Sequence, residues 1–176
     1  MKLLALDIST TCTGWFISKA SYGKIEPDAS MPFPDKLCYF RDEIEKLLNR
    51  YKPDVVVIED TYFRFGNVHT LKQLVKFGAV AMEVVARRKI QVETITATQA
   101  RKFCCGNQEG EFKKKEVFAY FVNKYGLHDW KFSSHNDITD AMALHWGYRE
   151  KQVAKKKTDT KKARAKTPRI RPSQEE

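Results

Sequence analysis

Two short apolar runs, each closed by an acidic residue, constrain the fold of this chain most. The first occupies residues 2–8 and contains Asp7, and the second occupies residues 55–58 and ends at Glu59. A continuous apolar run of this length is typical of a strand that is covered on both faces, as the central strands of parallel sheets are. Ligands of open α/β sheets gather outside the carboxyl ends of strands. If the two strands are neighbours, Asp7 and Glu59 therefore face each other at one edge of the sheet.

The other strands and helices follow from their periodicity. Residues 13–19 and 90–95 are expected to be strands, and residues 24–31, after a turn at 22–24, a third strand whose prolines favour an edge position. An amphipathic helix is predicted by apolar residues spaced three and four apart, which end before Pro53: Leu37, Phe40, Ile44, Leu47, Leu48 and Tyr51.

Further helices are expected at residues 68–88, 113–125 and 137–149, with a short helix capped by Thr96 or Thr98 and ending at Phe103. Strand–helix–strand units of this spacing imply parallel strands joined by right-handed crossovers, and the opening hairpin adds antiparallel pairs. We predict an α/β domain with a mixed five-stranded sheet and helices on both faces.

Length and composition indicate what size of domain the chain forms and where in the cell it is expected. Its 176 residues suffice for one domain with a buried core. No stretch approaches the roughly 20 apolar residues of a membrane-spanning helix, and Asp7 comes too early for a signal peptide, so we expect a cytoplasmic protein without a membrane partner. The four cysteines, at positions 12, 38, 104 and 105, match no zinc-binding spacing and are expected to be free thiols.

The net charge of +10 is concentrated near the C-terminus, since residues 150–176 contain ten Lys and Arg but only four acids. That segment is too polar to bury a core, so we expect one folded domain at residues 1–150 and a flexible basic tail at 151–176. A positive excess favours polyanionic partners, of which nucleic acid is the commonest. The tail could be a phosphate clamp or only a solubility or targeting segment.

Asp137 and Asp140 form a third acidic feature, three residues apart at the start of an expected helix and therefore on one face. Each acid alone could be an ordinary loop or helix-start residue. Together with Asp7 and Glu59 they would repel one another unless a cation joined them. Oxygen ligands favour Mg²⁺ or Mn²⁺ over Zn²⁺, and two such ions can activate water and stabilise the leaving oxygen in phosphodiester hydrolysis.

Three segments in series resemble the acidic motifs of RuvC-type Holliday junction resolvases. They are LDISTTCTGW at residues 6–15, VIED at 57–60 and NDITDAMA at 136–143. The resemblance spans about residues 1–149. The compact length and basic extension are most similar to the branch of this family that bacteriophages encode, which would place the protein in a host cytoplasm.

The resemblance implies a ribonuclease H-like fold and a homodimer that binds four-way DNA junctions and makes paired, Mg²⁺-dependent nicks, with Mn²⁺ as a substitute. Asp7, Glu59, Asp137 and Asp140 match the family's catalytic and metal-binding acids one by one. A symmetric dimer suits a substrate that needs two symmetric cuts. The helix expected at residues 68–88 matches the element that carries the family's dimer contact.

Two further segments match the family more loosely. Tyr62, Phe63 and Arg64 follow the second acidic strand, where the family has an aromatic residue that stacks on an opened base; one of these rings could instead pack at the sheet edge. A second set resembles the basic loop around the scissile phosphate, although residues 108–111 are unusually acidic for it: Arg101, Lys102, Lys113, Lys114 and Lys115.

His135 could contact a metal or protonate a leaving group, but a lone histidine near a helix start is more often a capping residue. His145 and the three tryptophans are expected to be structural.

Other functions share parts of this pattern. A flap, debranching or RNA–DNA hybrid nuclease of the same fold would use the same acids. A non-catalytic junction-binding protein would have no reason to keep clustered buried charges. An ATP-binding protein of the actin and sugar-kinase superfamily also begins with an acid, a Ser/Thr-rich turn and Gly, but it needs a second domain.

Overall fold

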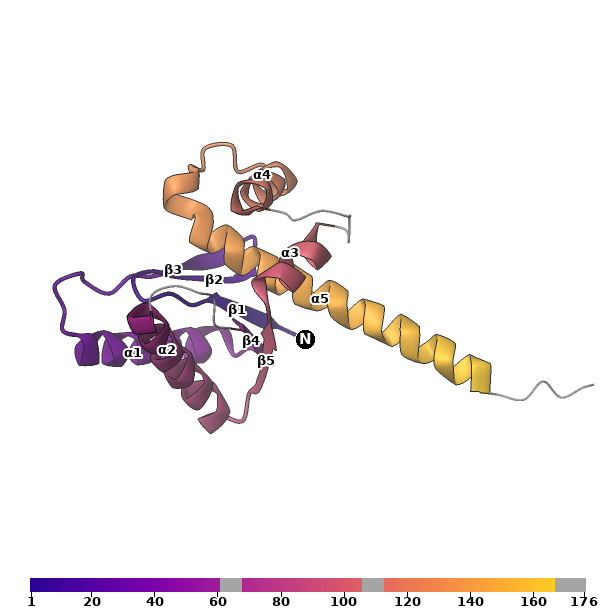
Figure 1. Ribbon diagram of the computed structural model, residues 1–176, viewed down its shortest axis with the longest axis horizontal. Helices are drawn as coiled ribbons and strands as arrows, with labels where there is room; N and C mark the ends of the chain where they lie inside the picture. The colour runs from indigo at the N-terminus through magenta and orange to yellow at the C-terminus, as the bar shows by residue number, and fades with distance from the viewer. Residues whose placement is uncertain (61–67, 106–112, 167–176) are drawn as a thin grey trace, which may run out of the picture.

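The structure is a computed structural model, and it describes residues 1–60, 68–105 and 113–166, with side chains up to residue 159. A five-stranded sheet with the order β3-β2-β1-β4-β5 forms its centre (Figure 1). The strands are β1 (Leu3–Asp7), β2 (Thr13–Ser18), β3 (Ser21–Ile25), β4 (Val55–Glu59) and β5 (Gln91–Ile95). β1 pairs in parallel with β4 and antiparallel with β2, so the sheet is mixed as expected.

The first hairpin differs from the sequence prediction. β3 begins at Ser21 and ends at Ile25, so the segment expected to turn, residues 22–24, lies inside the strand, and the turn falls at residues 19–20 instead. Gly23 misled the prediction because glycine usually marks a turn. Here it lies under the ring of Trp15, where an added Cβ would come within 2.9 Å of the indole.

The described residues form five helices: α1 (Phe33–Tyr51), α2 (Val68–Arg87), α3 (Ala97–Cys104), α4 (Lys114–Tyr125) and α5 (Phe132–Lys166). Pro34 stands in the first turn of α1, where its missing N–H costs nothing, and Lys52 ends that helix in a left-handed conformation. Thr96 caps α3 by accepting a hydrogen bond from the backbone N–H of Gln99 at 3.2 Å, so of the two caps considered Thr96 is the one used.

Alternate residues of the central strands face opposite helical layers. On one face, Leu4, Leu6, Val56 and Ile58 pack with α1 and α2; on the other, Leu3, Ala5, Val55 and Val57 pack with α3 and α5. Burial of each such side chain contributes roughly 1.5–3 kcal/mol, so both layers hold the sheet firmly. The continuous apolar runs therefore arise because β1 and β4 are covered on both sides.

α5 is much longer than the helix expected at residues 137–149. It begins at Phe132 and continues to Lys166, through residues 151–166 that were expected to lack regular structure. The physical reason is helix propensity: from Tyr148 to Thr167 the chain has neither Gly nor Pro and is rich in Lys, Ala and Arg. The expected boundary at residue 150 therefore lies inside a helix, and the second half of α5 projects beyond the sheet (Figure 1).

Candidate active site

Asp7 and Glu59 end the two adjacent central strands. Leu6 pairs with Ile58 in the parallel β1–β4 ladder, so the next residues, Asp7 and Glu59, lie side by side. They continue the alternation of Leu3 and Ala5 and of Val55 and Val57, and therefore point toward the layer of α3 and α5. The prediction that the two strands are neighbours is confirmed.

α5 crosses this face of the sheet at very short range. A Cβ on Gly14 of β2, which pairs with Asp7, would lie 2.0 Å from the backbone oxygen of Asp137. A Cβ on Gly147 would likewise lie 2.5 Å from the backbone of Ala100 in α3. Two glycines thus let the first turns of α5 rest directly on β2 and α3, which carries the acids of this helix to the strand ends.

Three carboxylates meet there. Asp7 and Asp140 are 8% and 7% exposed, respectively. Burial, a hydrogen bond to Glu59 and the negative charges of Asp140 and Glu59 raise the pKa of Asp7 well above its usual value. Burial also raises the pKa of Asp140, although neighbouring cations oppose that shift. The site therefore concentrates more negative charge than the protein alone stabilises.

Two basic side chains partly neutralise Asp140. Lys114 Nζ lies 2.6 Å from one carboxylate oxygen, and Arg101 lies 3.7 Å from the other. Burial alone would lower the pKa of Lys114, but the attraction of Asp140 and Asp7 outweighs burial and raises it. A small cavity of about 10 Å³, the space of one water molecule, lies among Glu59, Arg101 and Asp140.

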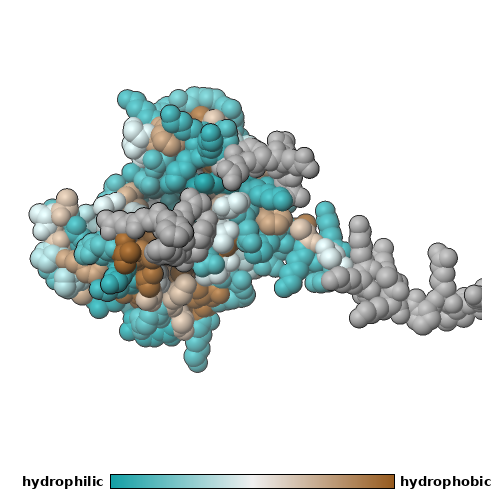
Figure 2. All heavy atoms as spheres, in the orientation of Figure 1, coloured by the Kyte–Doolittle hydropathy of each residue, from teal (hydrophilic) through white to brown (hydrophobic). Residues whose placement is uncertain are grey.

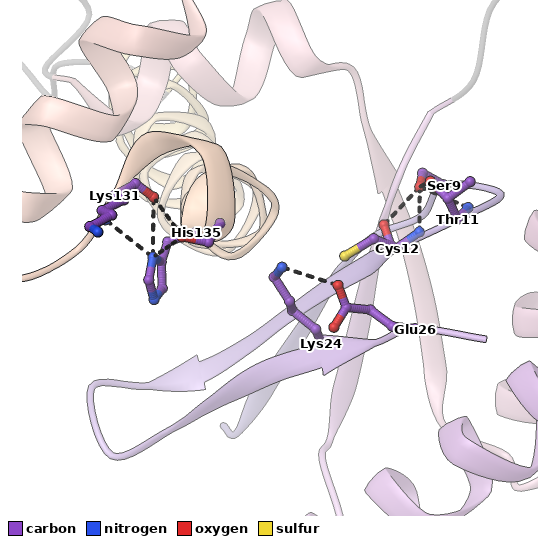
Figure 3. Close-up of polar contacts among 8 residues, drawn as sticks. Ser9, Thr11, Cys12, Lys24, Glu26, Lys131 and His135 are labelled. Carbon is purple, nitrogen blue, oxygen red and sulfur yellow. Dashed lines mark hydrogen bonds and ion pairs between the residues drawn. The ribbon is translucent and has the colours of Figure 1, made fainter. Parts of the chain in front are cut away.

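Asp137 has different neighbours. The Cys12 thiol donates a hydrogen bond to its carboxylate, and burial together with this carboxylate raises the pKa of Cys12 to about 12. Lys24 of β3 lies close enough to Asp137 for the two charges to attract each other. Its Nζ forms an ion pair with Glu26 Oε1 at 3.2 Å. Figure 3 shows Cys12, which directly precedes β2, and Lys24 of β3 reaching toward the same space.

The sequence analysis missed Cys12 and Lys24 as neighbours of an expected site acid. Cys12 was expected only to be a free thiol. Cys12 precedes the strand whose Gly14 pairs with Asp7, and only the sheet register reveals that this places it beside the site. The hairpin was expected to turn at residues 22–24, so the β2–β3 register that brings Lys24 beside Gly14 could not be predicted.

The remaining expected site residues fall into three groups. Tyr62, Phe63 and Arg64 lie outside the described residues. Lys102, Lys113 and Lys115 are exposed to solvent, and Lys113 directly precedes α4. Arg101 and Lys114 contact Asp140, and their expected contacts with DNA stay a prediction.

His135 serves its own helix start. Its Nδ1 lies 3.1 Å from the backbone oxygen of Lys131 and 3.2 Å from Ser134 Oγ, and its ring stacks on Trp130 at 4.6 Å. Figure 3 shows it apart from Cys12 and Lys24. These contacts favour the local hydrogen-bonding interpretation.

Within residues 1–60, 68–105 and 113–166, no three His, Cys, Asp or Glu side chains are arranged so that they could hold a metal ion as they stand. Over the same residues, no helix is long and apolar enough to cross a membrane.

An α/β sheet of this order, with acids at the ends of β1 and β4 and on a helix that crosses them, defines a ribonuclease H-like fold. The model of the crossover junction endodeoxyribonuclease RuvC family matches residues 9–146. This chain therefore belongs to the RuvC family of crossover junction endodeoxyribonucleases.

Individual relatives agree with this assignment. The crossover junction endodeoxyribonuclease RuvC of Rhizobium johnstonii is 27% identical over 152 residues, which cover 82% of this chain and 86% of the relative. That of Ruminiclostridium cellulolyticum is 28% identical over 153 residues, covering 82% and 89%. The structure of T. thermophilus RuvC in complex with a Holliday junction substrate has the same fold, with a TM-score of 0.70 at 13% identity, covering 85% of this chain and 93% of that one.

Proposed function

We propose that this protein is a structure-selective endonuclease that resolves four-way and other branched DNA by paired, metal-dependent hydrolysis of phosphodiester bonds. The observation that carries the proposal is the meeting of Asp7, Glu59 and Asp140 at the ends of the two central strands, in a chain of the RuvC family. Its location in the cytoplasm, of a host cell if a bacteriophage encodes it, stays a prediction.

The donor set fits a hard divalent cation such as Mg²⁺, with Mn²⁺ as a substitute. Three carboxylates supply oxygen ligands, and the raised pKa of Asp7 reflects a repulsion that a cation would relieve. The Lys114 ammonium already holds the place of a positive charge against Asp140. When bound, the divalent metal supplies an activated water and stabilises charge on the leaving oxygen.

The protein's own side chains have distinct parts in this proposal. Asp7, Glu59 and Asp140 would hold the metal, and Asp137, whose backbone rests on Gly14, would complete the set by turning from Cys12. Arg101 and Lys114 flank Asp140, so a DNA phosphate entering beside this acid would meet both cations.

Two-fold symmetric cutting implies a homodimer, and α2 is the proposed contact. Val75 and Met82 on this helix are 53% and 39% exposed, and Gly78 between them has open space where a Cβ would be. They line a groove of about 210 Å³ that also includes Ile8, Ile58 and Leu74. Figure 2 shows apolar residues gathered on the α1 and α2 side of the molecule.

The test is cleavage of end-labelled substrates with Mg²⁺ or a chelator. We expect paired nicks placed symmetrically at the branch of a four-way junction, no cutting of linear duplex, and loss of cutting in Glu59→Gln. Preferential cutting of a flap or of an RNA–DNA hybrid would move the assignment to another nuclease of this fold. Junction binding without cutting would identify a non-catalytic binding protein.

A further inference from the structure

The second half of α5 extends past the sheet and the helices packed on it (Figure 1). Residues 154–159 are exposed, and Val153 is 45% exposed. Lys151 Nζ donates a hydrogen bond to Gln99 Oε1 at 3.0 Å, near the point where the helix leaves the domain. Beyond it the helix projects away from the sheet (Figure 1).

The direction of this projecting segment is fixed by the core of the protein. The first half of the same helix buries Ala141, Met142 and Leu144 completely or almost completely against the sheet and its neighbouring helices. No Gly or Pro interrupts α5 between these anchors and Lys166, apart from Gly147, which itself packs on Ala100. A continuous helix therefore connects Asp140 to the C-terminal charges.

The projecting segment is strongly cationic. Residues 151–166 contain eight Lys and Arg and one acid, Asp159. Like charges one helical turn apart, such as Lys151 and Lys155, destabilise a helix unless an anion compensates them. The segment has Val153 as its sole large apolar residue, so it has no apolar face for a membrane surface or for a groove of another protein. This composition suits a regular line of phosphates.

We propose that residues 151–166 form a rigid arm that binds the phosphates of a duplex arm of the substrate, away from the cut. A helix rises about 1.5 Å per residue, so Lys151 and Lys166 lie about 16 and 39 Å along α5 from Asp140. At about 3.4 Å per base pair these distances reach about 5 and 11 base pairs from the scissile phosphate. That this duplex is an arm of a branched DNA substrate rests on the proposed function.

Binding to a four-way junction with long arms, measured by fluorescence anisotropy in chelator, tests the arm. The variant Lys155→Gln/Lys157→Gln should bind about tenfold more weakly at low salt and lose about 2 from the slope of log affinity against log salt. The control Lys36→Gln/Lys46→Gln removes two lysines of α1, on the opposite layer, of which Lys46 is exposed and Lys36 half-buried, and should bind as wild type does. An unchanged salt slope in the α5 variant overturns the proposal.

Position is tested with methylphosphonate patches, which neutralise chosen phosphates. A patch about 5–11 base pairs from the branch should weaken wild-type binding but add nothing to the Lys155→Gln/Lys157→Gln defect, whereas a patch beyond about 14 base pairs should change neither. If the loss of affinity caused by the patch and the loss caused by the variant add fully, the arm does not contact the phosphates about 5–11 base pairs from the branch. Binding to phosphatidylserine vesicles tests whether the segment binds a membrane instead. An α5 variant that binds the junction as wild type does, but no longer binds these vesicles, would also contradict the proposal.

Rigidity is tested by Ala154→Pro, which keeps every charge but breaks the helix. It should retain the salt slope and lose the dependence on patch position; a retained position dependence would show that no rigid helix is needed. Failure of the proposed function is a separate result, because it appears as equal affinity for junction and linear duplex. The salt slope for binding to linear duplex still reports whether the arm binds phosphates.

Discussion

The unusual residues of this protein are acids that the fold places against one another. Asp7 sits at the end of a buried strand, with Glu59 and Asp140 close enough to raise its pKa. Side chains of this kind lower the stability of the metal-free protein, because desolvation and repulsion both oppose the charged form. The cost is intelligible if a cation or DNA-bound metal is the normal partner of the site.

Asp7→Asn should therefore stabilise the metal-free protein at neutral pH while it abolishes cleavage. The folded state favours a protonated Asp7, so this residue costs stability once the pH exceeds 3.8, the ordinary pKa of an aspartate. We expect a gain of about 1 kcal/mol in the free energy of unfolding by urea in chelator. Asp42→Asn, at an exposed site on α1, should change stability little. A less stable Asp7→Asn protein would contradict this account of the site.

For His145 we expect the opposite pH dependence of folding stability from that of Asp7. It is 3% exposed and packs edge-on against Phe16, and burial lowers its pKa from 6.5 to about 3. The unfolded chain therefore binds a proton that the folded one does not, so this residue costs stability as the pH falls from 6.5 toward 3.

His145→Gln should flatten the stability curve in this range by up to about 1.4 kcal/mol per pH unit relative to wild type. His128→Gln, at an exposed histidine, is the control. Parallel curves for wild type and His145→Gln, followed by circular dichroism in urea, would exclude His145 as the cause.

At the scale of elements, the position of α5 on the sheet decides whether a site exists. Asp140 reaches the strand ends because Gly14 lets the helix lie on β2 and Gly147 lets it lie on α3. The contact at Gly14 is with backbone atoms of Asp137, which cannot move without displacing the helix.

Gly14→Ala should consequently lower both stability and cleavage. Overpacking against backbone costs about 1–3 kcal/mol and would shift Asp137 and Asp140 from their strand-end partners. Gly78→Ala is the matched control, since nothing lies within 4 Å of the added methyl group and alanine favours the helix. We expect this control to be as stable as wild type or more so in thermal unfolding. Equal behaviour of the two variants would refute the close-approach argument.

The proposed dimer contact on α2 gives a further prediction. Val75→Asp places a charge in the apolar groove beside Gly78 and Met82, and should shift the protein to monomers in sedimentation equilibrium while its circular dichroism stays unchanged. Ala86→Asp adds the same charge to an exposed position of the same helix outside this groove, and should leave assembly unaltered. A Val75→Asp protein that still dimerises would place the interface elsewhere.

At the scale of the whole molecule, the sequence was most informative where burial is two-sided. The apolar runs before Asp7 and Glu59 predicted two central strands, because a strand covered on both faces lacks alternation, and the β1–β4 pairing meets the stated condition that these strands are neighbours. The hairpin was mispredicted at Gly23, whose role is to lie under Trp15 rather than to turn the chain.

Two features depended on information that local sequence does not contain. The partners of Asp137 lie just before β2 and in β3, and their proximity follows from sheet register, which no spacing reveals. The length of α5 was underestimated because a polar, charged segment was equated with absence of structure, although its residues are good helix formers.

The most direct measurement is Mn²⁺ binding to the protein, followed by electron paramagnetic resonance, in wild type and in Asp7→Asn, Glu59→Gln and Asp140→Asn. The account predicts binding by wild type and at least about tenfold weaker binding by each variant, in parallel with loss of junction cleavage. Wild-type affinity in all three variants, or cleavage that persists in them, would contradict a metal site at the ends of β1 and β4.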